Sequence, residues 1–279
     1  MRIYKKAEDI THFIDQQTEK KLSVGFVPTM GALHEGHISL IKESKKECDI
    51  TICSIFVNPT QFNNLQDFEK YPSTIDDDIA LLELSGCDAL FLPEFDEIYP
   101  PTFEKEHYNL GNLEEVLEGK YRPGHFQGVC MVVDRLLSII KCNQLFLGLK
   151  DYQQCLVIQK MIELKKHPVQ IHFCDTVREP NGLAMSSRNK RLTPDEREVA
   201  TVLFSVLNNI KQKHLTIPIN ELLTEAKSTI EHKGFVIDYL TITNNKLQEL
   251  QTTSDAEQPI VLVAATLAQV RLIDNMALS

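Results

Sequence analysis

Several features that would place this 279-residue chain in a special class of proteins are missing from its sequence. The chain has no basic excess, because its formal net charge is −10 and its pI is about 5.4, which argues against broad binding to nucleic acid or an anionic membrane. It has no apolar run of membrane-spanning length, and its first residues have no signal-peptide core. We therefore expect a cytoplasmic protein with neither a membrane nor a nucleic-acid partner.

The cysteines lack the spacing of a disulfide framework or a zinc site. They number seven, are scattered through the chain, and include no C-x-x-C pair. Most lie in apolar runs, which favours reduced, buried thiols. Internal repeats and low-complexity tracts are also absent, and 43% hydrophobic residues with 24% charged residues is ordinary for a globular protein. The length is sufficient for two domains.

Two common nucleotide-binding patterns are missing as well. Neither G-x-G-x-x-G nor the Walker pattern occurs, so hydride transfer and P-loop phosphoryl transfer have no motif to support them.

What the chain does contain is an alternation of apolar runs and helical patterns through its first two thirds. Strands are expected at residues 22–27, 49–57, 89–92, 144–147 and 169–174. Helices are expected at residues 7–17, 38–46, 76–85 and 129–140. This order predicts right-handed βαβ crossovers, and therefore an α/β fold with a doubly wound, Rossmann-like parallel sheet. Residues 93–118 are expected to form a long connection with one short helix.

The last third has a different pattern. A helix is expected from 193 to 213, beginning with a capping threonine, a proline and two acids, and a second from 219 to 233. Antiparallel strands are expected at 236–243, 260–267 and 269–273, which predicts a smaller C-terminal α+β domain. We expect domains at residues 1–180 and 181–279.

The stretch Pro28 to His37, with the sequence PTMGALHEGH, lies between an expected strand and an expected helix. Free amide groups and the dipole at a helix start favour a phosphate, and Gly31 and Gly36 let the backbone approach a ligand. His34 and His37 are three residues apart, so on a helical turn both rings can point at one anion. The same spacing also fits exposed or core histidines beside an ordinary loop.

Other polar residues follow the expected strands, where ligands of such sheets collect. Gln61 has an amide that matches the oxygens of a hydroxy acid, although it also suits an ordinary turn. Lys150 can stabilise negative charge on a phosphate and Asp151 can accept from ribose hydroxyls, although the two also suit an exposed ion pair. Arg188 adds planar donors to a loop of small and hydroxyl residues.

Two further segments have two interpretations each. Residues 119–129 are expected to form a glycine-hinged loop, with Arg122 and His125, which either closes over an anion or is a structural turn. The acidic residues Asp76, Asp77 and Asp78 could help to hold Mg²⁺, but we favour a solvated helix start.

Together these motifs resemble the pantoate-beta-alanine ligase (pantothenate synthetase) family of the class I aminoacyl-tRNA synthetase-like nucleotidyltransferase superfamily. The resemblance is carried in order by PTMGALHEGH, FVNPTQF, RPGHFQGV, GLKDYQQ and REPNGLAMSSRN. The chain departs from the family at Ser73, where an arginine is usual, and at Leu149, where a glutamate is common. Cys130 and Met131 replace a more usual threonine, and Asn181 stands where an acid is frequent.

The resemblance implies ATP-dependent ligation of pantoate and beta-alanine to pantothenate through a pantoyl adenylate, with Mg²⁺, in a homodimer. It implies catalytic roles for His34, His37 and Lys150, and pantoate binding by Gln61 and Gln154. The first domain would bind nucleotide and pantoate, and the second would close over the site. The nucleotide-binding residues that it implies are Met30, Gly31, Ala32, Leu33, His34, Glu35, Gly36, His37, Gly148, Leu149, Lys150, Asp151, Val177, Met185, Ser186, Ser187 and Arg188. No metal ligand is identified.

Two alternatives stay open at this point. A nucleotidyltransferase of the same superfamily would leave the nucleotide on its product. A synthetase-derived RNA-binding module is the other alternative, although the acidic charge speaks against it.

Overall fold

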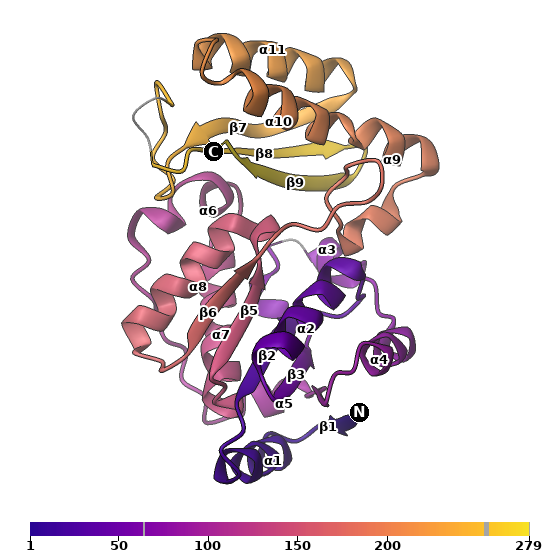
Figure 1. Cartoon of the computed structure of the whole chain (residues 1–279), viewed down its shortest axis with the longest axis vertical. Coiled ribbons are helices and arrows are strands. Elements are labelled where there is room, and N and C mark those ends of the chain that lie inside the picture. Colours follow the sequence, from indigo (N-terminus) through magenta and orange to yellow (C-terminus); the bar gives the residue numbers. More distant parts are fainter. Residues whose placement is uncertain (64, 254–256, 279) are drawn as a thin grey trace. The chain divides into compact units, whose positions relative to one another are not determined.

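A computed structural model describes residues 1–63, 65–253 and 257–278 of the chain. The contacts divide it into two compact units, shown with their elements in Figure 1. Unit 1 comprises Met1–Leu149 and Gln153–Asp175, and unit 2 comprises Lys150–Tyr152 and Thr176–Ser279. The second segment of unit 2 begins at Thr176, shortly before the domain boundary that we expected after residue 180.

Unit 1 is built on a six-stranded sheet with the order β1-β4-β3-β2-β5-β6, in which every paired strand is parallel. The predicted α/β fold with a doubly wound sheet is confirmed. Edge strand β1 was not predicted, because its three residues are too few to show a period. The strands are β1 Arg2–Tyr4, β2 Val24–Thr29, β3 Ile50–Ile55, β4 Ala89–Phe91, β5 Gln144–Gly148 and β6 Gln170–Cys174.

Helices cover both faces of this sheet. They are α1 Ala7–Glu19, α2 Glu35–Glu47, α3 Leu65–Glu69, α4 Ile75–Leu84, α5 Phe95–Ile98, α6 Leu117–Tyr121, α7 His125–Ile140 and α8 Tyr152–Lys165. Three 3₁₀ turns accompany them: η1 Pro59–Gln61, η2 Gly111–Glu114 and η3 Leu149–Asp151. The expected connection at 93–118 therefore contains more helical structure than the single helix we predicted.

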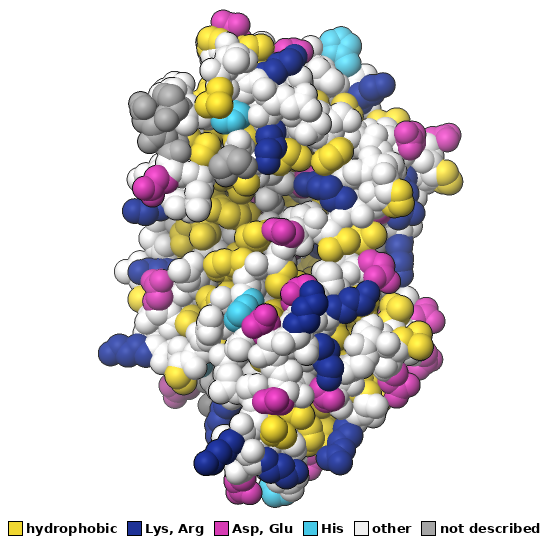
Figure 2. Space-filling view, in the orientation of Figure 1, with side chains coloured by type: hydrophobic (Ala, Val, Ile, Leu, Met, Phe, Trp, Pro, Cys, Tyr) yellow, Lys and Arg dark blue, Asp and Glu magenta, His cyan; other side chains and the backbone are white. Residues whose placement is uncertain are grey.

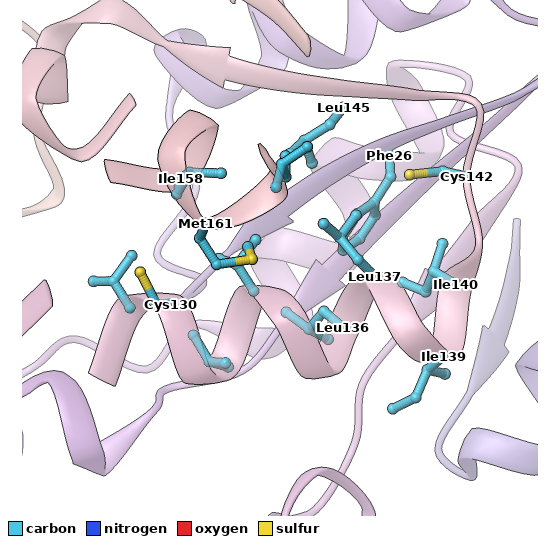
Figure 3. Close-up of a cluster of buried hydrophobic side chains, with 14 of the residues drawn as sticks. Phe26, Cys130, Leu136, Leu137, Ile139, Ile140, Cys142, Leu145, Ile158 and Met161 are labelled. Carbon is cyan, nitrogen blue, oxygen red and sulfur yellow. The ribbon is translucent and has the colours of Figure 1, made fainter. Parts of the chain in front are cut away.

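Alternating side chains supply the two cores of unit 1. Phe26 of β2 and Leu145 of β5 pack with α1, α7 and α8, and Figure 3 shows Phe26 beside Leu137 of α7. Their neighbours Val27 and Phe146 face the opposite core, which α2 and α4 complete. Because both faces are buried, the strands are almost continuously apolar, which is why the sequence revealed them.

Strand β2 lies inside the sheet, between two parallel neighbours. Strand β3 pairs with one side of β2 and β5 with the other, so the order reverses at β2 and β5. In open α/β sheets, ligands bind beyond the carboxyl ends of the strands at such a reversal. Residues 30–34 follow β2 at this edge, and Leu149 follows β5.

Helix α7 begins four residues earlier than the expected Val129. Gly124 has a φ of +79° and precedes the helix, which starts at His125, so residues 125–128 are helical and only the short stretch between α6 and α7 is a loop. Gly128, near the start of the helix, is a point of close packing, because a Cβ there would lie 2.4 Å from the Thr60 carbonyl oxygen. The expected glycine-hinged loop at 119–129 is thus largely wrong.

Unit 2 has a three-stranded antiparallel sheet with the order β7-β8-β9, so the predicted α+β domain is confirmed. Helices α10 and α11 pack on it through a shared apolar core (Figure 1). Its elements are η4 Ser187–Arg191, α9 Pro194–Ala200, α10 Val202–Lys213, α11 Ile219–His232, β7 Phe235–Thr243, β8 Ile260–Leu267 and β9 Val270–Ala277. The single helix expected at 193–213 is two helices that meet at Thr201, and the first carries a capping box of Thr193 and Glu196.

All seven cysteines are free, and six are buried, as the sequence predicted. Burial raises the pKa of Cys142 and Cys130 to about 12, and that of Cys87 to about 11. These thiols are therefore protonated near neutral pH and are not nucleophiles there. None of the helices in the described residues is long and apolar enough to cross a membrane.

Candidate active site

The predicted site residues fall into two groups, one in each unit. Unit 1 holds Met30, Gly31, Ala32, Leu33, His34, Glu35, Gly36, His37, Gln61, Gly148, Leu149 and Gln154. Unit 2 holds Lys150, Asp151, Val177, Met185, Ser186, Ser187 and Arg188.

The loop after β2 is held from below by Asp78 of α4. Its two carboxylate oxygens accept the Ala32 and Leu33 amides, each at 2.8 Å, and Thr74 Oγ1 adds a third hydrogen bond at 3.0 Å. Asp78 is 1% exposed, so the solvated helix start that we favoured is wrong for this residue. Ala32 has a φ of +49°, a left-handed conformation that these bonds stabilise.

This arrangement also changes the expected source of anion binding. The Ala32 and Leu33 amides are already bonded to Asp78, and the Gly36 amide donates to His34 Nδ1 at 3.1 Å. The amides of Ala32, Leu33 and Gly36 therefore already have partners within the protein. The imidazoles of His34 and His37 are left as the chemically versatile groups of the loop.

The two histidine rings lie together, as their spacing predicted. Their centroids are 4.1 Å apart and the ring planes are tilted by 37°. His34 is the N-cap of α2, and His37 lies in its first turn. Because His34 Nδ1 accepts an amide hydrogen, the proton of the neutral ring must be on Nε2, which makes that atom a hydrogen-bond donor.

Gln61 lies next to this loop. Its Nε2 is 2.8 Å from Met30 Sδ, and its Oε1 accepts from Asn58 Nδ2 at 3.2 Å. Thioether sulfur is a weak acceptor, so a stronger one can replace it. The amide of Gln61 therefore presents its nitrogen, as a donor, toward the loop after β2.

Asn58 fixes that orientation from a fully buried position at the end of β3. Its Nδ2 also donates to the Gly128 carbonyl at 3.1 Å, while its Oδ1 accepts from Tyr99 Oη at 3.1 Å and from Thr60 Oγ1 at 3.0 Å. Burial raises the pKa of Tyr99 to about 12, so its hydroxyl stays a neutral donor near neutral pH.

His125 is not part of a glycine-hinged loop, and its side chain supports Gln61. Its buried ring donates from Nδ1 to the Gln61 carbonyl at 2.7 Å. Of the two interpretations of residues 119–129, the structural one therefore applies to His125 and Gly128. Arg122 lies 3.7 Å from the carboxylate of Glu118 in α6.

The glutamine pair at the start of α8 divides into two roles. Gln153 is 3% exposed and bonds the Glu118 amide and the carbonyls of Leu113 and Val116 at 2.8–3.0 Å, so it is structural. Gln154 is half-buried, and its predicted contact with pantoate stays a prediction.

In unit 2, Lys150 is held through its backbone. Its carbonyl accepts from Asn275 Nδ2 of β9 at 2.9 Å, and its ammonium lies 3.6 Å from Asp151 Oδ1. The Lys150 side chain is one-fifth exposed.

The loop of unit 2 that carries Ser186, Ser187 and Arg188, here called the serine loop, is folded by local hydrogen bonds. Ser186 caps η4 by accepting the Arg188 amide at 3.2 Å, and the Met185 amide donates to the Val177 carbonyl at 3.0 Å. Asn189 donates to Glu179 at 2.8 Å and to the Ala184 carbonyl at 3.0 Å. The loop is therefore an ordered turn at the helix start of η4.

Charges are interspersed on the face drawn in Figure 2, where Lys and Arg lie among Asp and Glu. Among the residues that the structure describes, no three His, Cys, Asp or Glu side chains form a group that could hold a metal ion. The Asp78 oxygens serve the backbone, while Asp76 and Asp77 are exposed.

Comparison with known proteins decides the family. The family profile described as pantoate-beta-alanine ligase matches residues 2–277. The chain belongs to the pantoate-beta-alanine ligase family. It is 39% identical over 280 residues to a pantothenate synthetase of Porphyromonas gingivalis, with 99% of each chain covered.

Solved structures of pantoate-beta-alanine ligases have the same fold. A pantothenate synthetase from Thermus thermophilus matches with a TM-score of 0.93 and 36% identity, covering 100% of this chain and 99% of that one. A pantoate-beta-alanine ligase from Francisella tularensis, complexed with beta-gamma ATP and beta-alanine, matches with a TM-score of 0.84 and 39% identity, covering 100% and 98%.

Three residues that organise the predicted site segments were not identified from the sequence: Asn58 and Asp78 in unit 1 and Asn275 in unit 2. Asn58 lies inside the FVNPTQF motif and Asp78 is one of three consecutive aspartates, but neither residue has a distinguishing local signal. Asn275 lies in β9 but beyond the strand that we expected at residues 269–273, so no pattern pointed to it. Their roles depend on partners far away in the sequence, at separations of 46 residues for Asp78 and Ala32 and 125 for Asn275 and Lys150.

Proposed function

We propose that this ligase makes pantothenate in two steps through a pantoyl adenylate, using the residues described above. The chain is a pantoate-beta-alanine ligase that uses ATP. The observation that carries this function is the family match, which extends over nearly the whole chain. The adenylate and the residue roles are our proposal, supported by the histidine pair at the sheet edge.

In the first step, the pantoate carboxylate attacks the α-phosphorus of ATP and pyrophosphate leaves. Anionic charge concentrates on the phosphates, so preorganised donors lower the barrier. His34 supplies an Nε2 hydrogen, and His37 acts as a proton donor or a cation toward the phosphates. This negative charge on the phosphates is also stabilised by Lys150, Ser186, Ser187 and Arg188. The family resemblance adds further nucleotide-binding residues, namely Met30, Gly31, Ala32, Leu33, Glu35, Gly36, Gly148, Leu149, Asp151, Val177 and Met185.

In the second step, the beta-alanine amine attacks the acyl carbon of the adenylate, and AMP leaves with the pair of electrons from the broken bond. Gln61 donates from Nε2 to a pantoate oxygen in both steps, in place of its contact with Met30. Gln154 adds a second contact to pantoate. No residue of the chain is assigned to Mg²⁺; bound together with ATP, the ion would neutralise part of the phosphate charge.

Two broader expectations also stay proposals. The free thiols support a reducing compartment such as the cytoplasm. The homodimer rests on the family resemblance.

The test is ATP-pyrophosphate exchange, followed by product analysis with labelled ATP. We expect exchange that depends on pantoate without beta-alanine, and free AMP only when beta-alanine is added. A labelled nucleotide retained on the final product would instead identify a nucleotidyltransferase, and tight retention of tRNA in filter binding would favour the RNA-binding alternative.

His37→Ala gives the matched residue-level test. We expect it to fold normally and to reduce exchange by about 10²–10³-fold, the usual loss for one donor to a charged transition state. Unchanged exchange would remove His37 from the first step.

A further inference from the structure

Strand β9 anchors two segments of unit 2 that were singled out separately in the sequence. Asp274 and Asn275 are adjacent on this strand and are 4% and 9% exposed. Successive strand residues point to opposite faces of a sheet. Asp274 has the parity of Val270 and Leu272, which lie in the core beneath the helices, whereas Asn275 has the parity of Arg271.

Asp274 holds the segment that leads to the serine loop. Arg178 makes a bidentate ion pair with Asp274, with distances of 2.6 and 2.9 Å, and donates to the Asn275 carbonyl at 3.2 Å. The same guanidinium donates to the Gly182 carbonyl at 3.1 Å and lies 4.8 Å from the Phe204 ring centroid. This planar donor set fixes the start of the turn that carries residues 182–188.

Asn275 holds the other segment. Its Nδ2 donates to the Lys150 carbonyl at 2.9 Å, and its own amide donates to Asp274 Oδ1 at 2.8 Å. The carboxylate of Asp274 thus orders both the Arg178 segment and the residue that holds Lys150. Removing the Asn275 side chain would leave the Lys150 carbonyl without this donor.

We propose that Asn275 is a positioning residue for Lys150, and that the Asp274–Arg178 ion pair holds the serine loop to the same strand. The proposal rests on the proposed function, in which Lys150 and the loop with Arg188 stabilise the phosphates of ATP. Strand β9 then acts as one support for both cationic segments. Since a shift of about 1 Å can lower a rate by as much as 10²-fold, a backbone anchor of this kind affects turnover.

The experiment measures ATP-pyrophosphate exchange in the full chain with the single variants Asn275→Ala, Asn275→Leu and Lys150→Ala and the double variant Lys150→Ala/Asn275→Ala. Leucine keeps the branched shape of asparagine without its donor, although its side chain is larger. Asp238→Asn is the control, because it weakens the 2.6 Å ion pair with Arg271 on the same sheet, a pair that includes neither Asn275 nor Lys150. Thermal unfolding is followed for every variant.

We expect both Asn275 variants to reduce the kcat of exchange by about tenfold while the KM for pantoate changes less than twofold. Lys150→Ala should lose more, and the double variant should match Lys150→Ala, because Asn275 acts through Lys150. The Asp238→Asn control should exchange like the unaltered protein.

Two results would overturn the inference in distinguishable ways. If Lys150→Ala lowers exchange measurably but the Asn275 variants keep the full rate per folded molecule, or add a separate loss in the double variant, Asn275 is merely structural while the proposed function stands. If Lys150→Ala leaves exchange unchanged, the proposed role of Lys150 fails and the positioning role fails with it.

Discussion

Asp78 shows how one buried carboxylate can define a ligand loop. Two backbone amides that an anion would otherwise attract are bonded to this side chain, each at 2.8 Å. The Asp78 carboxylate therefore holds the backbone of Ala32 and Leu33. His34 and His37 follow these residues directly, at the start of α2. The loop is therefore preorganised by the protein itself, and in the proposed function its contact with phosphate is made by the imidazoles.

Replacing Asp78 by asparagine should disturb this loop with little change in volume. The new amide nitrogen cannot accept, so one backbone N–H loses its partner, which costs about 1–3 kcal/mol of unfolding free energy. We expect kcat/KM for ATP in the exchange assay to fall about tenfold or more as His34 and His37 lose their placement. Chemical denaturation and exchange kinetics measure the two effects.

Asp77→Asn is the control for this substitution, because Asp77 is the exposed neighbour in the same helical turn. It should leave both quantities nearly unchanged. Equal behaviour of the two variants would show that the carboxylate of Asp78 does not order the nucleotide loop.

At single positions, the sequence predicted residues whose chemistry is local. The His34 and His37 spacing predicted adjacent rings, and the structure confirms it. The role of Asp78 could not be predicted, because its partners are 45 and 46 residues away and helix-start acids are ordinarily solvated. Long-range hydrogen bonds leave no periodic signal in a sequence.

Helix α7 shows the same limit for an entire element. Its apolar stripe predicted the helix, but the glycines before Val129 were interpreted as hinges. Gly128 is instead a contact point, where the helix backbone meets the Thr60 carbonyl in the segment that carries Gln61. The strands were easier to predict because burial on both faces leaves a continuous apolar run.

Gly128→Ala tests whether this glycine is a contact or a hinge. Helix propensity alone would favour alanine by about 1 kcal/mol. The added methyl would lie 2.4 Å from a backbone oxygen, and such overpacking typically costs about 1–3 kcal/mol, so we expect net destabilisation. We also expect a raised KM for pantoate, because Thr60 adjoins Gln61. Urea unfolding and exchange kinetics provide the measurements.

Ser138→Ala, on an exposed position of the same helix, should be nearly neutral in both measurements. A Gly128→Ala protein that is more stable than the original, with unchanged pantoate kinetics, would contradict the contact role.

Across the whole chain, the predicted order of a parallel sheet followed by an antiparallel one is confirmed, whereas the functional division at residue 180 stays a prediction. Unit 2 contains Lys150–Tyr152, which the sequence placed with the first domain because they directly follow a strand of its sheet. The sequence could assign these residues only by their order in the chain. The hydrogen bond from Asn275 instead connects Lys150 to β9 of unit 2. Contacts, not neighbouring residues, determine which unit a short segment joins.

The two units have separate apolar cores, and this predicts separable opening. Leu207 of α10 is fully buried in the core of unit 2, and Ile41 of α2 is fully buried in unit 1. Leu207→Ala and Ile41→Ala should each cost about 2–5 kcal/mol. Because proteins open in cooperative units, Leu207→Ala should accelerate amide hydrogen exchange in β7, β8 and β9 while β2 and β3 stay protected, and Ile41→Ala should do the reverse. Equal acceleration of both sheets by either variant would mean that the chain unfolds as one cooperative body, and the two-domain division would then be wrong.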